Sequence, residues 1–485
     1  MITSRARFRF SLLAATTLLA GIAGADIALP GVFSDHMVLQ RGCEMTVWGQ
    51  ADPSETVRVT LGESVATTVA APDGSWQVHL PAADAGGPLL LTVAGKNELQ
   101  FEDVMIGDVW VCSGQSNMEW PVSASQHAAE VIAAAGEHPN IRLLHMPRSV
   151  AGQPLQDVPA TWARCSAESV RGFSAVGLAF GMAVAEKENV AIGLIESAWG
   201  GTRIEPWTAR AGFADVPSLQ TIAEEIAQAN ATFAEQVQQD AAAEHPLASH
   251  TAPTGLYNAM IAPLTHFAIA GVIWYQGESN VGDGALYTDK MRALISSWRG
   301  AWHRDDLPFL WVQLAPFNYG QSREGQLPLL WEAQQKALAI SSTGMAVIND
   351  ISNVSDIHPR NKQEVGRRLA LIALAQVYGH DDVMWSGPVF KRMTIQDSRA
   401  TLTFDHVHGG LQSRDGEAIS HFEIAGEDQV FVSAQSRIEN DSIIVWNDAI
   451  AHPVAVRFAW SQTAEPNLVN GAGLPAGAFR TDTWE

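Results

Sequence analysis

Short apolar segments alternate with segments of helical periodicity throughout residues 104–385, and this pattern constrains the fold more than any other feature of the chain. The apolar segments are rich in β-branched and aromatic residues and read DVWVC, IRLLHM, AIGLIES, AGVIWYQ, FLWVQL and GMAVIND. The helical patterns occupy residues 174–188, much of 216–243, 286–298, 327–340 and 362–378. Strands that alternate with helices form a parallel sheet covered on both faces. The pattern therefore predicts an α/β fold for this region.

Polar clusters follow several of these expected strands at the point where each strand ends. SGQSN comes after VWVC, SAWGGTRIEPW after IGLIE, GESN after VIWYQ, and SDIHPRN shortly after AVIND. Ligands of parallel sheets bind at the carboxyl ends of the strands. The regular position of the clusters therefore predicts one functional site at that edge of the sheet.

A serine and a histidine in these clusters suggest acyl transfer. Ser116 is a poor nucleophile until a base takes its proton, and His358 lies in a loop just before an expected helix, where it can act as that base. Asp356 can accept a hydrogen bond from the imidazole and fix its tautomer. Each pattern alone is also common in ordinary turns. Asp356 and His358 are also a possible metal pair, but no third ligand is evident.

Acyl transfer also needs hydrogen-bond donors for the negative oxygen that develops in the transition state. Gly200 and Gly201 offer backbone N–H groups that a ligand can approach closely, and Gln276 and Asn280 offer side-chain amides. The alternative is that both segments are ordinary glycine-containing loops.

The regions on either side of the α/β segment have the character of β structure. Short β-branched runs separated by Pro, Gly and Asp turns predict a small β-sandwich over residues 26–103 and a second β-domain over 386–485. Three arginines, a short apolar run and Ala23-Gly24-Ala25 predict a cleavable signal peptide over residues 1–25. We therefore expect a secreted or periplasmic protein.

The amino-acid composition argues against some classes of binding partner. The formal charge is −22, and cleavage at residue 25 removes three arginines and no acidic residue. Such an acidic surface argues against nucleic acid as a partner, and no later segment is long and apolar enough for a membrane anchor. Three cysteines allow one disulfide at most, and the sequence does not say which pair it would join.

The ordered set DVWVCSGQSNMEWP, ESAWGGTRIEPW, VIWYQGESN and DIHPRNKQEVGRRLAL resembles the sialate O-acetylesterase family of SGNH (GDSL-type) hydrolases. LPGVFSDHMVLQR, GLYNAMIAPL and NLVNGAGLPAGAFRTDTW extend the resemblance over nearly the whole mature chain. It implies a three-layer α/β esterase fold with N- and C-terminal accessory β-domains. It also implies a serine mechanism, without metal or cofactor, that releases acetate from O-acetylated sugars.

Carried over to this sequence, the resemblance makes Ser116 the nucleophile and His358 the base. The oxyanion donors become the Ser116 N–H, the N–H of Gly201 or its neighbour Gly200, and the Gln276 amide in preference to Asn280. The family usually places the acid three residues before the histidine, where this chain has Ser355. Asp356 therefore remains one candidate beside Asp350, Glu278 and a backbone carbonyl.

Aromatic and charged residues next to the motifs suggest contacts with a sugar. We assign Trp199, Arg203 and Asn280 to substrate binding, and Trp120 and Trp207 also lie near the motifs, although Arg203 and Trp207 are equally suited to structural roles. O-acetyl sialic acid and acetylated plant polysaccharides both remain candidate substrates, and the acidic surface slightly favours a neutral glycan. The alternatives are a non-catalytic carbohydrate-binding protein and a broader lipase or thioesterase of the same superfamily.

Overall fold

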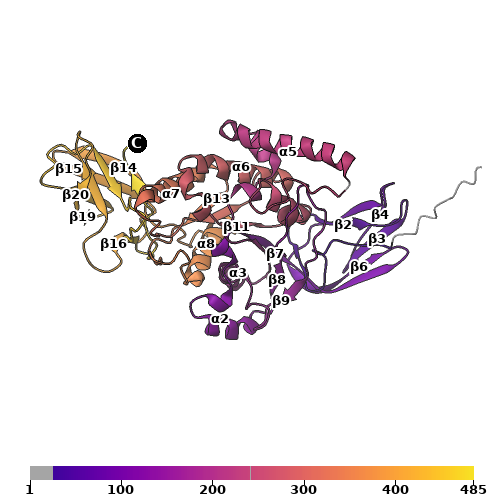
Figure 1. Ribbon diagram of the computed structural model, residues 1–485. Coiled ribbons are helices and arrows are strands. Elements are labelled where there is room, and N and C mark those ends of the chain that lie inside the picture. The colour runs from indigo at the N-terminus through magenta and orange to yellow at the C-terminus, as the bar shows by residue number, and fades with distance from the viewer. Residues whose placement is uncertain (1–25, 241, 485) are drawn as a thin grey trace, which may run out of the picture.

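The computed structural model describes residues 26–240 and 242–484, so the expected signal peptide lies outside the described residues. The N-terminal β strands lie at one end of the molecule, the helices and central sheet in the middle, and the C-terminal β strands at the other end (Figure 1). In the described part of the chain, no helix is long and apolar enough to cross a membrane.

The centre of the molecule is a largely parallel sheet, which confirms the predicted α/β fold. Its strand order is β13-β12-β11-β7-β10-β8-β9, and only β9 on this path runs antiparallel to its neighbour. The strands are β7 (Glu98–Gly114), β8 (Ile141–His145), β9 (Trp162–Arg164), β10 (Ala191–Ala198), β11 (Gly271–Tyr275), β12 (Phe309–Val312) and β13 (Thr343–Ala346). Chain order reverses at β7, which lies between β10 and β11, and such a reversal opens a crevice at the carboxyl ends of the strands.

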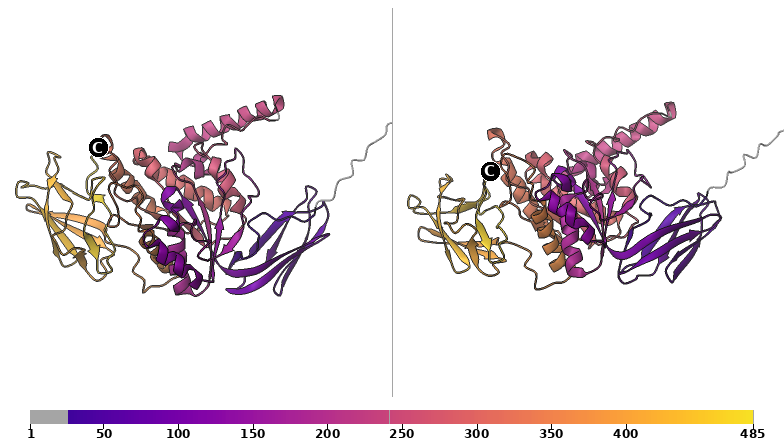
Figure 2. Two further views of the ribbon diagram at one scale, coloured as in Figure 1. Left: turned by 60° about the horizontal axis from the view of Figure 1, so that its bottom comes forward. Right: turned by 90° about the horizontal axis from the view of Figure 1, so that it is seen from below.

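Helices cover both faces of the sheet (Figure 1). Helices α3 and α8 pack against each other on one face, and α6 and α7 pack against each other on the other face. The helices are α3 (Ala175–Glu188), α4 (Arg210–Ala214), α5 (Gln220–Gln239), α6 (Leu286–Ala301), α7 (Gln326–Lys336) and α8 (Lys362–Gln376). Helix α5 projects from the body in both views of Figure 2, and its buried residue is Ile226.

Strand β7 joins the N-terminal β region to the central sheet. Its first half pairs antiparallel with β6, and its second half pairs parallel with β10 and β11, so the strand passes the boundary expected at residue 103 without a break. The strands before it are β1 (Val38–Gln40), β2 (Met45–Gln50), β3 (Thr56–Leu61), β4 (Ser64–Val69), β5 (Ser75–Leu80) and β6 (Gly86–Ala94). Strands β2 and β5 form a separate antiparallel ladder.

The C-terminal region contains small antiparallel sheets, as predicted. Their strand orders are β14-β15-β20-β19, β16-β22 and β18-β17-β21-β23. The longer strands are β14 (Val389–Gln396), β15 (Arg399–Asp405), β17 (Phe422–Ala425), β19 (Gln435–Glu439), β20 (Ser442–Trp446) and β21 (Ala455–Phe458). The shorter strands are β16 (Leu411–Ser413), β18 (Val432–Ser433), β22 (Leu468–Asn470) and β23 (Phe479–Arg480). The three cysteines, Cys43, Cys112 and Cys165, are all free.

Candidate active site

Ser116 is held at the carboxyl edge of the sheet by the tight exit of strand β7. Gly114 ends the strand with φ +140, and a Cβ at this position would lie 2.1 Å from the carbonyl oxygen of Tyr275 on β11. Only glycine permits so close an approach of the two backbones. Ser116 is then the first residue of the short helix α1 (Ser116–Glu119), at the point where the strand order reverses.

His358 comes from the loop between β13 and α8 and meets Ser116 across the crevice. Its Nε2 atom lies 2.8 Å from Ser116 Oγ. The loop ends where Asn361 caps α8, because the Asn361 side chain accepts a hydrogen bond from the Glu364 N–H at 3.2 Å. The predicted nucleophile and base are therefore within hydrogen-bonding distance.

Asp356 lies near the histidine but does not hydrogen-bond to its ring. The distance from Asp356 Oδ1 to His358 Nδ1 is 3.7 Å, whereas the same oxygen accepts the backbone N–H of His358 at 3.0 Å. Of the other candidate acids, Asp350 forms a buried ion pair with Arg368 at 2.6 Å, and Glu278 accepts a hydrogen bond from Asn117. Of these three acids, Asp356 is the one whose contact with His358 is seen in the described residues, and this contact is with the backbone N–H.

The glycines that we expected in the oxyanion hole differ in whether their N–H groups are engaged. A Cβ on Gly200 would lie 3.2 Å from Ser116 Cβ, so this glycine packs directly against Ser116, but its N–H donates to Glu119 at 2.8 Å. Gly201 follows in the left-handed region with φ +77, next to open space. Within the described chain, the N–H groups of Ser116 and Gly201 donate to no other atom. This arrangement favours Gly201 over Gly200 as a donor.

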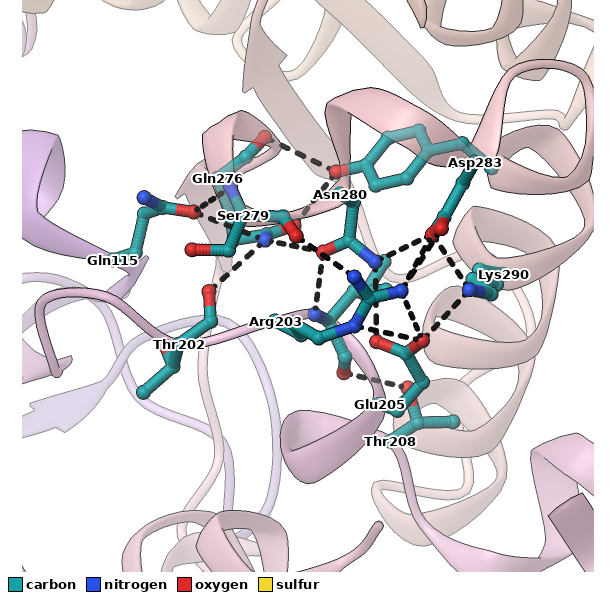
Figure 3. Close-up of polar contacts among 12 residues, drawn as sticks. Gln115, Thr202, Arg203, Glu205, Thr208, Gln276, Ser279, Asn280, Asp283 and Lys290 are labelled. Carbon is teal, nitrogen blue, oxygen red and sulfur yellow. Dashed lines mark hydrogen bonds and ion pairs between the residues drawn. The ribbon is translucent and has the colours of Figure 1, made fainter. Parts of the chain in front are cut away.

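The Gln276 amide, which we expected in the oxyanion hole, is occupied by other partners (Figure 3). Its Nε2 atom donates to Gln115 Oε1 at 3.0 Å, to the Thr202 carbonyl at 3.1 Å and to Asn280 Oδ1 at 2.8 Å. Its Oε1 atom accepts from the Tyr287 hydroxyl at 2.8 Å, and the residue is fully buried. In this geometry Gln276 ties loops together and has no N–H free for substrate.

Asn280 and Arg203 belong to the same network of hydrogen bonds and ion pairs (Figure 3), and the Arg203 side chain is half-buried. Asn280 is fully buried, accepts the Ile204 N–H at 3.0 Å and donates to carboxylates. The Arg203 guanidinium binds Glu205 and Asp283, which also bind Lys290. Asn280 and Arg203, two of the three residues that we assigned to substrate binding, thus hold the second and third motifs together.

The tryptophans near the motifs have three different environments. Trp199 is half-buried and stacks on His250, with ring centroids 5.3 Å apart, beneath the Arg148 guanidinium. Trp207 is fully buried, and its Nε1 donates to Thr202. Trp120 stacks on His358 itself, with centroids 4.7 Å apart and an interplanar angle of 21°. Trp199 therefore remains a candidate for sugar contact, whereas Trp120 contacts the predicted base.

The environment of His358 favours its neutral form. Partial burial lowers the pKa of His358, the nearby Lys362 lowers the same pKa further, and Asp356 opposes this shift. A neutral imidazole near neutral pH is the form that can accept a proton from serine. Among the described residues, no group of three His, Cys, Asp or Glu side chains is arranged to hold a metal ion.

Comparisons with known proteins agree with this chemistry. The profile of a family described as carbohydrate esterase, sialic acid-specific acetylesterase, matches residues 106–375. The sialate O-acetylesterase of Rattus norvegicus is 30% identical over 79% of this chain and 80% of its own length. That of Pongo abelii is 29% identical over 90% of this chain and 88% of its own length. A crystal structure of a carbohydrate acetylesterase from Xanthomonas citri is 39% identical, covers 95% of this chain and 100% of its own, and superposes with a TM-score of 0.85.

Proposed function

Because the chain belongs to the sialic acid-specific acetylesterase family of carbohydrate esterases, and is therefore a carboxylic ester hydrolase active on O-acetyl groups, we propose that it deacetylates carbohydrates through a covalent acetyl-Ser116 intermediate. The distance of 2.8 Å between Ser116 Oγ and His358 Nε2 carries the proposal. This contact joins residues from two loops far apart in sequence, and it is the contact that a nucleophile and its base require.

In the first half-reaction, His358 Nε2 takes the proton of Ser116 as Oγ attacks the acetyl carbonyl carbon. The N–H groups of Ser116 and Gly201 bind the resulting oxyanion, and one such donor is worth about 3 kcal/mol of barrier. When the tetrahedral intermediate collapses, the bond to the sugar oxygen breaks and the protonated His358 gives its proton to that oxygen. The deacetylated sugar leaves, and the acetyl group stays on Ser116.

In the second half-reaction, His358 takes a proton from water, and the hydroxide attacks the acetyl carbonyl. Collapse returns the proton from His358 to Ser116 Oγ and releases acetic acid, which loses its proton to solvent and becomes acetate. We propose that Asp356 supports both steps by its hydrogen bond with the His358 backbone N–H and by its negative charge, which favours the imidazolium.

The direct test compares p-nitrophenyl acetate, butyrate and octanoate for the wild type and for Ser116→Ala. We expect the acetate ester to be preferred and Ser116→Ala to lose turnover by a factor of about 10³ or more. Turnover at the wild-type level by Ser116→Ala would remove the mechanism. A preference for octanoate would favour a lipase-like enzyme, and no turnover by the wild type would favour a carbohydrate-binding protein.

A second test separates the candidate acids. We expect Asp356→Asn to lower kcat, because it removes the charge that favours the imidazolium. Asp350→Asn is the matched control, since Asp350 is engaged with Arg368 rather than with the histidine. Equal kcat values for Asp356→Asn and the wild type would remove Asp356 from the mechanism.

To identify the natural substrate, acetate release must be measured with a panel of O-acetylated sialosides and plant glycans. We propose that the half-buried Trp199 contacts the sugar, so that Trp199→Ala raises KM more than it lowers kcat. We also propose that residues 1–25 direct export. N-terminal sequencing of the exported protein should then begin at Asp26.

A further inference from the structure

The side chain of Asn117 connects the segment that carries Ser116 to the loop that carries His358. Its Nδ2 atom donates to the carbonyl of Ile357 at 3.0 Å and to Glu278 Oε1. Its Oδ1 atom accepts from the Lys362 ammonium. Because a carboxylate and a carbonyl lie on one side and an ammonium on the other, only one orientation of the amide fits. Asn117 follows Ser116 in the chain, and Ile357 precedes His358.

Lys362 lies in an unusual position for a lysine. It is the first residue of helix α8, where a positive charge opposes the helix dipole, and it is fully buried. Its Nζ atom faces the rings of Tyr275 at 5.2 Å and Trp120 at 5.9 Å. Burial lowers the pKa of Lys362 to about 7, and the negative charges of Glu278 and Asp356 oppose this shift. A buried lysine of this kind is costly for folding, which points to a role in the site.

Glu278 is the matching acid of this cluster. Burial raises its pKa, and its Oε2 atom is buried without a hydrogen-bond partner in the described part of the chain. The carboxylate thus offers one oxygen to Asn117 and exerts a favourable field on Lys362. Asn117, Glu278 and Lys362 together form what we call the buried amide clamp.

We propose that Asn117 and Lys362 are positioning residues of the esterase: with Glu278, they fix the distance between Ser116 and His358. The Lys362 ammonium also lies over the Trp120 ring that stacks on His358, so it places a positive charge near the base. The inference rests on the Ser116–His358 mechanism proposed above and adds residues that do not touch substrate. The clamp acts on the nucleophile through the helix that starts at Ser116, and on the base through the carbonyl just before His358.

The charges that face His358 allow the electrostatic part to be tested separately. Lys362 lowers the pKa of His358, and Asp356 raises it. Tyr275 and Tyr319 interact with Glu278 instead, and burial raises the pKa of both phenols, so they stay neutral. Lys362 is cationic mainly below about pH 7, which is the range in which His358 titrates. Its removal should therefore raise the pH at which His358 loses its proton.

The experiment compares pH profiles of kcat/KM for p-nitrophenyl acetate. In Lys362→Met we expect the acid limb to move to higher pH by about half a unit or more. Lys391→Met is the matched control, because Lys391 is an exposed residue on β14 that pairs with Asp405. It removes the same charge from a screened position and should leave the limb in place. An unmoved limb in Lys362→Met would overturn the electrostatic role.

Two further variants guard against a folding failure and test the geometry. Lys362→Met/Glu278→Gln removes both buried charges at once, and we expect it to fold and to show the same upward shift of the limb. Asn117→Ala should lower kcat about 10- to 100-fold with KM little changed, because the distance between nucleophile and base is no longer fixed. Adding Lys362→Met to Asn117→Ala should cost less than the two single losses combined, since they act through one contact.

The outcomes distinguish this inference from the proposed mechanism. Activity in Ser116→Ala would refute the mechanism and the clamp with it. An inactive Ser116→Ala, together with additive losses in the double variant and an unmoved acid limb, would refute the clamp alone.

Discussion

The stacking of Trp120 on His358 gives a prediction whose size follows from the geometry. The rings lie 4.7 Å apart at 21°, an arrangement that holds the imidazole plane toward Ser116. Such aromatic pairs contribute about 0.5–1.5 kcal/mol beyond the area that they bury. Trp120→Ala removes this stabilisation of the imidazole orientation. If the full amount is added to the activation barrier, kcat should fall about 2- to 13-fold, since about 1.4 kcal/mol corresponds to a factor of ten.

The control is Trp120→Phe, which keeps a ring against the imidazole. The Trp120 Nε1 atom is buried but has no hydrogen-bond partner among the described residues, so phenylalanine loses no protein contact of that kind. The assay is kcat at saturating p-nitrophenyl acetate, with thermal unfolding measured in parallel. We expect Trp120→Phe to retain most of the activity. Wild-type kcat in Trp120→Ala, or equal losses in both variants, would refute a role for ring stacking.

Three further predictions follow from contacts around the site. Gly114→Ala should lower the free energy of unfolding by about 1–3 kcal/mol or more in urea denaturation, because its Cβ would lie 2.1 Å from the Tyr275 carbonyl oxygen. Asn280→Ala should cost about 1–3 kcal/mol of stability, because it leaves the buried Ile204 N–H without its acceptor and removes one hydrogen bond from Glu205 and one from Asp283, whereas the KM for p-nitrophenyl acetate should hardly change. The acid limb of kcat/KM in the wild type should lie below pH 6.5, because burial, and then Lys362, lowers the pKa of His358; a limb above pH 6.5 would contradict this environment.

The central sheet was predictable because its strands are buried on both faces and read as continuous apolar runs. Strand β7 shows the limit of this signal. Its first half alternates between exposed and half-buried residues, while its second half is almost entirely buried. The same strand thus has two sequence patterns, because it pairs antiparallel in one region and parallel in the other. The sequence shows a change of character near residue 104, but it does not show that one strand crosses it.

The residues of the candidate site were predictable where the chemistry requires a particular residue type. They were less predictable where neighbouring residues determine the orientation of a side chain. A serine nucleophile requires a base, and this requirement led from Ser116 to His358. Nothing in the sequence tells whether a buried amide faces substrate or another loop. Gln276 and Asn280 face other loops, since their nitrogen and oxygen atoms are engaged by protein groups. The contact of Trp120 with His358 likewise depends on the direction in which the chain leaves helix α1. This helix has only four residues, so its sequence shows no periodicity from which the direction could be predicted.

The residues around Ser116 show why this strand ends in so many polar side chains. Gln115 Oε1 accepts hydrogen bonds from the loop of residues 276–279. Asn117 donates to the loop that carries the histidine, and Glu119 accepts the N–H of Gly200 at 2.8 Å. Alternate side chains along one short turn therefore bind each of the other three loops of the site.

This arrangement connects the segment that carries Ser116 directly to the loops that carry His358, Gly200 and Gln276. The position of each loop relative to Ser116 is then fixed by a direct hydrogen bond, and not only by the connection of both segments to the sheet. Catalysis by acyl transfer depends on distances of about 3 Å, and loops joined only through the sheet would be free to vary by more than that tolerance allows. The polar residues on either side of Ser116 thus have a physical reason: Gln115 and Asn117 hold the loops around this serine in a fixed geometry.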